Sequence, residues 1–364
     1  LLRGTLEISE LKLEKPSLTL VKQGNKNNWS PASAHKPAKS ADAADKNAAS
    51  ATASAVVLRN VEVRDGSISF VDALQKQSYT LSGLALDASM DTLDSPFHFS
   101  AKAMLNQQSI SVKGAFDNVG SLLAQRPAEV KLSIKSAPLS VDFLGVYDAI
   151  RLIGELDARS PSTSALAQWL GQKTTAAQND RLVVRGNAEL GIEEYALKQA
   201  SLEWGALTAR GDVLINLSHK LPFISAQLQT DELDLSPWLV APKPSASLIR
   251  PALADAARWD RTPIDLSFLR AFEGNVTLKA ESFTASRFNA TNLSLRAKLE
   301  RGILNATLSD LGLYGGTLDS QLTLNSNSTL QGRVDGKDIA LEPLLLSLQD
   351  SSDISGTLAL NSTI

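Results

Sequence analysis

Few residues in this chain have the types and spacing that covalent or metal chemistry requires. Its three histidines, His35, His98 and His219, lie far apart in the sequence and share no metal-ligand spacing with acidic neighbours. The sequence contains no cysteine, which excludes disulfides, thiolate metal sites and thiol nucleophiles. We therefore expect no metal site, no cofactor and no catalytic residue.

Acidic side chains gather at Asp231, Glu232 and Asp234, and a similar group, Asp338 with Glu342, recurs further along the chain. One interpretation is a pair of carboxylates that performs acid–base catalysis. The other is the chemistry of turns and helix N-termini, where acidic residues are favoured. Because the grouping recurs where the strand pattern is interrupted in a similar way, we favour the structural interpretation.

Nucleotide-binding and serine-nucleophile motifs are also missing: neither a P-loop, a dinucleotide fingerprint nor G-x-S-x-G occurs. Gly315-Gly316 lies between two strand patterns with no helix after it, which predicts a hairpin or bulge rather than a phosphate cradle. The five tryptophans are spread along the chain; we expect most to be local anchors, and the alternative is a position at a membrane interface. A non-enzymatic protein is the expectation that follows.

Composition bounds the class of protein. The 364 residues suffice for two ordinary domains or one elongated one, and 43% of them are apolar although only 5% are aromatic. The net charge is −3, and no basic stripe is present, which argues against nucleic-acid binding. No stretch approaches the roughly 18 uninterrupted apolar residues of a membrane-spanning helix.

Period-two alternation of apolar and polar residues dominates the chain and predicts strands. Asp65-Gly66 predicts a hairpin within the stretch 56–72. Helices are expected only at 141–152, 161–171, part of 236–259 and 342–349. Residues 31–55 are rich in Ala, Ser, Lys and Asp, which is typical of a flexible linker; the alternative, an Ala-rich helix, is disfavoured by two prolines and scattered serines. The stretch 240–263 is Pro-rich.

Alternation is cleanest near the C-terminus, where aliphatic residues two apart must share one face of a strand. The residues predicted to line an apolar, lipid-binding groove are Val276, Leu278, Leu293, Leu295, Leu299, Leu318, Leu322 and Leu324. An antiparallel sheet needs a cover for its apolar face, and this chain offers few helices to provide it. The alternatives are a closed sandwich or barrel core and a sheet that curls around its own apolar face.

An internal repeat of about 100 residues is visible in 131–144, 226–239 and 332–345. Each segment runs from a strand through a polar break to a short apolar stretch that looks like the start of a helix. A further strand follows each segment, beginning at Gly154, Gly274 or Gly356. Stacked copies of such a unit would extend one continuous sheet.

These segments resemble the AsmA-like family of Gram-negative envelope proteins. The resemblance rests on 1–30 with its Asn28-Trp29 ending, GELDARSPSTSALAQWLG, the strand–turn unit that ends in LDLSPWL, and the C-terminal part around Leu313-Tyr314-Gly315-Gly316. The resemblance implies a repeating β-groove, a periplasmic location, an inner-membrane anchor upstream of this sequence, and a role in outer-membrane biogenesis.

We therefore predict a mostly β protein in which an elongated, twisted antiparallel sheet curls into an apolar groove, with a few short helices. The predicted segments are 1–30 after a missing anchor, the linker 31–55, groove repeats 56–240, an insertion 241–263 and a C-terminal repeat 264–364. The predicted function is to bind and conduct phospholipid or another acylated lipid between the inner and outer membranes. The alternative is a structural protein that modulates outer-membrane protein assembly by pairing its sheet edges with client strands.

Overall fold

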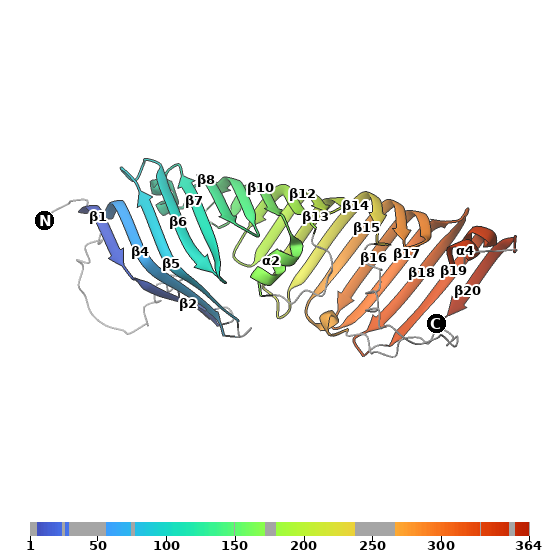
Figure 1. Cartoon of the computed structure of the whole chain (residues 1–364). Helices are drawn as coiled ribbons and strands as arrows, with labels where there is room; N and C mark the ends of the chain where they lie inside the picture. The colour runs from blue at the N-terminus through green and yellow to red at the C-terminus, as the bar shows by residue number, and fades with distance from the viewer. Residues whose placement is uncertain are drawn as a thin grey trace, which may run out of the picture. The chain divides into compact units, whose positions relative to one another are not determined.

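A computed structural model describes residues 6–23, 26–28, 56–73, 77–148, 150–171, 180–236, 266–327, 329–348 and 354–363. Strands dominate, as the sequence predicts, and the chain divides into two compact units, Leu1–Leu182 and Val183–Ile364 (Figure 1). The boundary between the units falls within the predicted segment 56–240. The linker 31–55 and the insertion 240–263 lie outside the described residues.

Unit 1 consists of strands and two short helices. The strands are β1 (Leu6–Glu14), β2 (Ser17–Gln23), β3 (Lys26–Asn27), β4 (Val56–Asp72), β5 (Gln77–Ser89), β6 (Phe97–Leu105), β7 (Gln108–Phe116), β8 (Ala128–Ser136), β9 (Ser140–Tyr147) and β10 (Leu152–Ser160). The helices are α1 (Val119–Leu123) and α2 (Thr163–Trp169), and Asn118 and Ser162 cap their N-termini by accepting backbone N–H bonds.

The described part of unit 2 also consists of strands and two short helices. Its strands are β11 (Leu182–Leu190), β12 (Glu194–Trp204), β13 (Leu207–Asn216), β14 (Phe223–Asp234), β15 (Glu273–Ala285), β16 (Phe288–Glu300), β17 (Ile303–Leu313), β18 (Gly316–Asn325), β19 (Leu330–Ala340) and β20 (Thr357–Thr363). A 3-10 helix, η1 (Ser267–Arg270), precedes β15, and α4 (Leu341–Leu348) follows β19.

Most neighbouring strands are antiparallel. They include β4 to β10 in unit 1, and β13 with β14 and β15 with β16 in unit 2. Three pairings among the described strands are parallel, at two places in the chain: β1 and β2 each pair with β4, and β14 pairs with β15. Parallel neighbours require a long connection that returns the chain to the same end of the sheet. The two stretches without a strand pattern, 31–55 and 240–263, fall in those two connections.

The strands keep their apolar residues on one face through a recurring three-residue step. In β17, Leu308 and Leu311 pair with Ser320 and Leu318 of β18, which are two residues apart and so share a face. The extra residue is a β-bulge, which bends the strand and increases its twist. The same step separates Leu197 from Ala200 in β12, Gly336 from Ile339 in β19, and Val63 from Gly66 in β4.

A residue with positive φ sits inside each of these steps: Asp65 (50°), Gln199 (49°), Asp310 (55°) and Asp338 (53°). This conformation costs an ordinary L-residue about 1–2 kcal/mol, and Asp tolerates it better than most. Two of the bulges have an aspartate on the next strand. The N–H of Gln199 donates to Asp212 Oδ1 at 2.8 Å, and the N–H of Asp310 donates to Asp319 Oδ1 at 2.9 Å.

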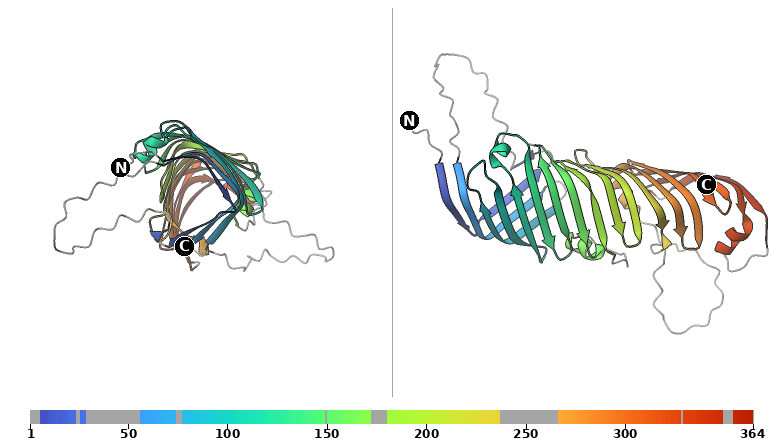
Figure 2. Two further views of the ribbon diagram at one scale, coloured as in Figure 1. Left: turned by 90° about the vertical axis from the view of Figure 1, so that its left-hand side faces the viewer. Right: turned by 90° about the horizontal axis from the view of Figure 1, so that it is seen from above.

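Bulged strands give each unit a curved sheet, and Figure 2 shows the strands of each unit bent rather than flat. One face is much less accessible than the other. In β16, Ala290, Leu293 and Leu299 are only 7%, 8% and 6% exposed, whereas Arg296 and Lys298 on the opposite face are exposed. No second sheet covers this face among the described strands. We call the face with the buried side chains the inner face and its opposite the outer face.

Two sequence predictions of local structure are wrong. The expected helix at 141–152 is β9 and the turn into β10, because Val141, Phe143 and Gly145 pair with β8 on one face. The expected hairpin at Asp65-Gly66 is the bulge within the continuous strand β4. The expected helices at 161–171 and 342–349 are confirmed as α2 and α4. The helix expected within 236–259 lies outside the described residues after Ser236.

The three repeated segments adopt different structures despite their similar sequences. Segment 131–144 forms the β8–β9 hairpin, and its polar break is the turn. The described part of segment 226–239 is one strand, β14, whose break between Thr230 and Leu233 is a step within the strand. Segment 332–345 is the bulged strand β19 followed by α4. The hairpin predicted at Gly315-Gly316 is confirmed, with Tyr314 and Gly315 in the turn at positive φ.

Close approach of two strands makes Gly154 sensitive to substitution. Gly154 pairs with Gly145 across β9 and β10, and a Cβ at 154 would collide with the Leu144 carbonyl oxygen and the Gly145 Cα. We expect Gly154→Ala to lower the free energy of unfolding by about 1–3 kcal/mol in urea denaturation followed by circular dichroism. Gly315→Asn is the control, because Gly315 has φ 80° and open space around it. Equal stability of the two variants would contradict the prediction.

Candidate functional site

The eight aliphatic residues predicted from alternation all lie on the inner face of unit 2. Cross-strand register places them there in direct pairs: Val276–Ala297, Leu278–Leu295, Ala280–Leu293, Gly274–Leu299, Leu311–Leu318, Ala306–Leu322 and Leu304–Leu324. Directly opposed residues share a face and lie close enough for their side chains to touch. The sequence pattern therefore identified one continuous apolar surface across β15–β18, whose role in lipid binding stays a prediction.

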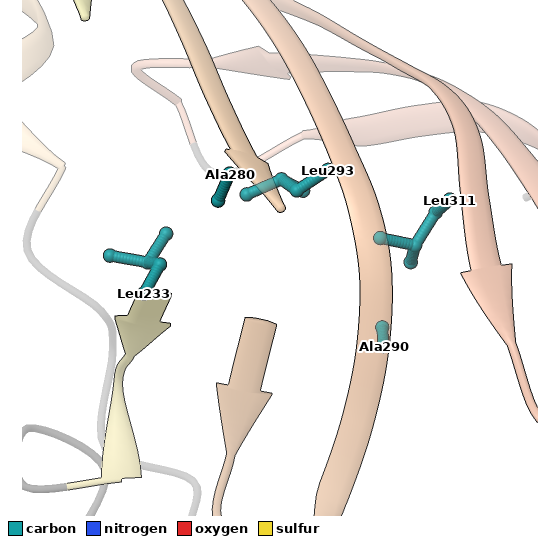
Figure 3. Packing of buried hydrophobic residues seen from close by; sticks show 5 residues of the cluster. All are labelled: Leu233, Ala280, Ala290, Leu293 and Leu311. Carbon is teal, nitrogen blue, oxygen red and sulfur yellow. The ribbon is translucent and has the colours of Figure 1, made fainter. Parts of the chain in front are cut away.

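Beyond the bulges, residues that the alternation did not single out complete this surface. Figure 3 shows Leu233, Ala280, Ala290, Leu293 and Leu311, a cluster of buried side chains from β14 to β17. Leu293 was predicted, whereas Leu233, Ala290 and Leu311 lie on the far side of a three-residue step. A strict period of two assigns them to the wrong face. The sequence signal that would have found them is an apolar pair spaced by three across a polar dipeptide, such as Ser309-Asp310.

Part of the predicted groove is covered by the chain itself. Leu266 and Leu269, in and beside η1, pack on Leu299, with Leu304, Leu324 and Phe272 around them. Leu269 is 0% exposed, and Arg270 Nε donates to Ser326 Oγ at 2.9 Å, which fixes η1 at this end of the strands. Leu299 and Leu324 therefore pack against the chain's own leucines, and the inner face further along these strands has no such cover among the described residues.

Charged side chains are missing from the inner face wherever the register defines it between β12 and β19. Its polar members are uncharged, and several bond to the backbone. The Thr230 hydroxyl donates to the Glu232 carbonyl oxygen at 2.8 Å, and the Tyr195 hydroxyl donates to the Ile192 carbonyl oxygen at 3.0 Å. A surface of this kind can bury hydrocarbon and offers no charge to a polar headgroup.

Aromatic residues mark the inner face of unit 1, and the sequence analysis did not single them out. The rings of Phe97, Phe99 and Phe116 lie with their centroids 5.9–6.4 Å apart, and the Phe99 ring fills the space over Gly114. The spacing of Phe97 and Phe99, two residues apart within a strand, was a usable signal. Unit 1 therefore also presents an apolar inner face, lined in part by aromatic rings.

Helix α2 is anchored at one end of unit 1 by Trp169. The indole N–H donates to the Leu105 carbonyl oxygen at 2.9 Å, and Asn106 Nδ2 donates to the Trp169 carbonyl oxygen at 2.7 Å. These bonds hold α2 against the β6–β7 turn, so the expectation of a local anchor is confirmed for Trp169. Trp29, Trp238 and Trp259 lie outside the described residues.

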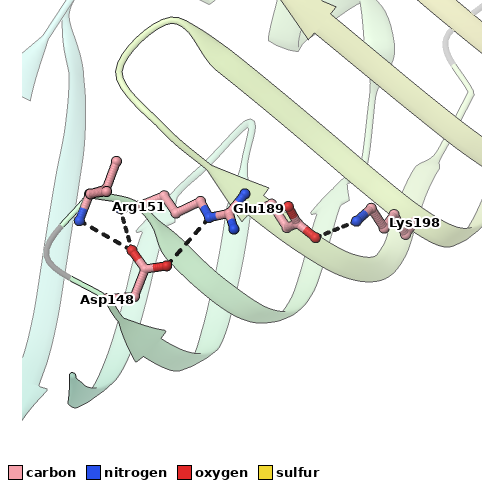
Figure 4. Close-up of polar contacts among 5 residues, drawn as sticks. Asp148, Arg151, Glu189 and Lys198 are labelled. Atoms are coloured by element: carbon pink, nitrogen blue, oxygen red, sulfur yellow. Dashed lines mark hydrogen bonds and ion pairs between the residues drawn. The ribbon is translucent and has the colours of Figure 1, made fainter.

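The outer face carries charges of both signs. Acidic and basic residues two apart in one strand pair on the same side, as in Lys298–Glu300 at 2.8 Å and Arg333–Asp335 at 2.6 Å. The hydrogen bond from Arg333 lowers the pKa of Asp335, and that from Lys298 lowers the pKa of Glu300. Figure 4 shows two further pairs, Asp148 with Arg151 and Glu189 with Lys198. Exposed pairs of this kind contribute little stability and keep the face hydrated.

A cavity of about 530 Å³ also opens on the outer face of unit 2, beside the bulges. Arg210, Lys279, Glu281 and Asp310 contribute to its lining, so it mixes charges of both signs. This lining is unsuited to an acyl chain, which needs an uncharged wall.

Of the carboxylates that the sequence analysis grouped together, Asp234 makes a turn contact. Asp234 Oδ1 accepts the Ser236 N–H at 2.8 Å, and bonds from the Ser236 side chain and backbone lower the pKa of Asp234. His219 lies edge-on to Phe223 with ring centroids 6.4 Å apart, His98 lies on β6, and His35 falls outside the described residues. Within the described ranges, no three metal-ligating side chains are grouped closely enough to hold an ion.

Comparisons with family models, with curated proteins and with solved structures found no match to this chain. Among the helices that the structure describes, none combines the length and hydropathy needed to cross a membrane. The resemblance to the AsmA-like family stays a prediction from the sequence.

The burial of Leu269 predicts a large cost for its truncation. Leu269→Ala removes a fully buried side chain from the cluster that covers Leu299, so we expect the free energy of unfolding to fall by about 2–5 kcal/mol. Ile303→Ala, at a position 40% exposed on the neighbouring strand β17, should change it by less than about 1 kcal/mol. Chemical denaturation of both variants checks this, and similar losses for both would show that η1 does not close this end of the sheet.

Proposed function

We propose that this protein is a non-enzymatic groove protein whose inner face holds the acyl chains of phospholipid or another acylated lipid. One observation carries the proposal. From β12 to β19 the inner face of unit 2 contains no charged residue, and this face stays uncharged across every bulge that the register defines. The described elements place no second layer over this face, so the part that η1 does not cover is a candidate surface for a ligand.

The energetics favour hydrocarbon as the ligand. Moving a CH₂ group out of water gains about 0.8 kcal/mol, so two tails of about 16 carbons would cost on the order of 25 kcal/mol to carry exposed through water. An aliphatic wall offers these tails surroundings similar to those in a bilayer. Transfer into the groove is then close to neutral in free energy and needs no catalytic residue.

The inner face of unit 2 is long enough for an acyl tail to occupy more than one position along it. Eight strands, β12 to β19, at a spacing of about 4.8 Å extend the inner face for roughly 35 Å along the stack. The tails of one leaflet span about 15 Å, half of a hydrocarbon core that is about 30 Å thick. A tail on this face can therefore shift along it without leaving apolar contact, which is the physical requirement for conduction.

The wider biological role rests on the resemblance to the AsmA-like family. It includes movement of lipid between inner and outer membranes, a periplasmic location and an inner-membrane anchor upstream of this sequence. These assignments support the choice of phospholipid as the first ligand to test and stay predictions.

Lipid carried by the purified protein tests the proposal. We expect phospholipid to be extracted from the wild-type protein and to be visible as bound mass in native mass spectrometry. Leu322→Asp places a charge on the inner face, which costs several kcal/mol beside a buried tail, so bound lipid should fall at least tenfold. Gln321→Asp is the matched control, because Gln321 is the adjacent residue on the outer face and is exposed.

Two outcomes would count against lipid binding. One is lipid-free wild-type protein, and the other is equal loss of lipid in the two aspartate variants. Circular dichroism and an unfolding curve separate loss of lipid from loss of fold.

A second candidate function, pairing of a sheet edge with a client strand, is favoured by one observation. Strand β20 pairs only with β19 among the described strands, and its sequence TLALNST has no charge and no proline to block its outer edge. By contrast, β1 and β2 in unit 1 are separated by Pro16 and carry several charges. Under this function, strand peptides that alternate apolar residues should bind, and Leu360→Pro should abolish their binding without changing bound lipid.

A further inference from the structure

The strand ends of unit 2 form two rims with different side chains. We define rim A as the end marked by the register pairs Asn216–Phe223, Phe223–Glu273, Glu300–Ile303 and Leu324–Leu330. The connections β11–β12, β13–β14, β16–β17 and β18–β19 lie along it. Rim B is the opposite end, where the β12–β13, β15–β16 and β17–β18 turns lie.

Each of the four rim A connections carries an exposed aliphatic side chain within it or next to it. Their exposed fractions are 81% for Ile192, 39% for Leu217, 40% for Ile303 and 47% for Leu330. Ile192 is the most exposed large hydrophobic residue among those that the structure describes. A single exposed leucine or isoleucine is ordinary on a protein surface, but one in every connection along the same rim is a pattern.

The tight turns at rim B lack this feature. They are Gly205-Ala206, Ser286-Arg287 and Tyr314-Gly315, and none of them contains an exposed large aliphatic residue. Rim B does have exposed aliphatic residues beyond β19, at Leu346 in α4 and at Ile354 before β20. The difference between the rims therefore concerns the strand-to-strand connections: those at rim A carry exposed aliphatic side chains, and the two-residue turns at rim B do not.

From this contrast we infer that rim A docks on the surface of a lipid bilayer, with its aliphatic residues inserted among the lipids. A protein partner usually meets one continuous patch that packs closely. The rim A residues are instead on separate connections with polar residues between them. A deformable hydrocarbon layer can accept such isolated tips, because each side chain buries its own apolar surface there.

The charges at rim A indicate whether its binding to a bilayer requires anionic lipid. Lys220 and Arg301 are accompanied by Glu193, Glu194 and Glu300, and Arg301 pairs with Glu300 at 3.6 Å. The backbone N–H of Arg301 also donates to Glu273 Oε1 at 3.2 Å. Because the rim has no excess of positive charge, its binding should not depend on anionic lipid. Uncharged phosphatidylcholine vesicles are the appropriate probe.

This inference goes beyond the proposed lipid groove. Ile192 and Ile303 are not inner-face residues, so docking can be measured whether or not the groove holds lipid. Extraction of bound lipid reports the groove, and vesicle binding reports the rim.

The absence of cysteine in the sequence permits a direct test. Single cysteines are introduced into the full chain as Ile192→Cys, Ile303→Cys and Ala206→Cys and are labelled with a polarity-sensitive fluorophore. Ala206 lies in an exposed rim B turn and is the matched control. On addition of phosphatidylcholine vesicles, emission from positions 192 and 303 should move to shorter wavelength and emission from position 206 should not.

Affinity provides the second measurement. In vesicle flotation, the double variant Ile192→Ser with Ile303→Ser should bind about tenfold more weakly than wild type, because less apolar surface enters the bilayer. Leu144→Ser, at a position 51% exposed on β9 of unit 1, should bind as wild type does. A fluorescence shift at all three positions, at position 206 alone or at none of them would overturn the inference. So would a requirement for anionic phosphatidylglycerol in the vesicles.

Discussion

Continuity of an apolar face through bent strands is the constraint on which the rest of this structure depends. A strand alternates its side chains between two faces, so one inserted residue would move every later apolar residue to the opposite face. In this chain the sequence compensates for each inserted residue. Across a bulge, successive inner-face residues are three positions apart instead of two, as from Leu308 to Leu311. The strands can therefore bend without turning their apolar residues out to water.

The bulges are supported by polar groups that lie away from the inner face. Gln199 and Asp310 adopt positive φ, and the carboxylates of Asp212 and Asp319 accept their backbone N–H bonds from the neighbouring strands. Glycines such as Gly145 and Gly154 let the backbones approach where a Cβ would collide. Curvature thus depends on a few aspartates and glycines, while the aliphatic residues are left free to form a wall.

A single curved layer leaves a question that a sandwich does not, namely what covers the apolar face. Close to η1 the answer is the chain itself, through Leu266 and Leu269. Elsewhere on the face of unit 2, the ligand that we propose is an acyl chain, because its properties match an uncharged aliphatic wall. The two proposals concern different surfaces, since the inner face would hold the tails and the turns at rim A would meet the bilayer. Polar and charged residues of the outer face keep the remaining surface hydrated.

Alternation in the sequence was sufficient to determine most of the strands, the inner face of β15–β18 and the eight aliphatic residues on it, because period two is a local property of an extended chain. It could not determine Leu233, Ala290 and Leu311, because their face depends on bulges that only pairing with a neighbouring strand defines. The helix expected at 141–152 failed for a similar reason: VDFLGVY is compatible with either structure until β8 pairs with it.

The tertiary structure likewise decided three other features. They are the parallel pairing of β14 with β15, the cover that η1 places over Leu299, and the alignment of exposed aliphatic side chains along rim A. Each of these features joins segments that are distant in sequence. No local pattern of residue types records which strand ends meet at the same rim. What the sequence determined by itself is therefore an apolar face, and what the tertiary structure decided is how that face bends, where the chain covers it and which of its rims carries an exposed aliphatic side chain at each connection.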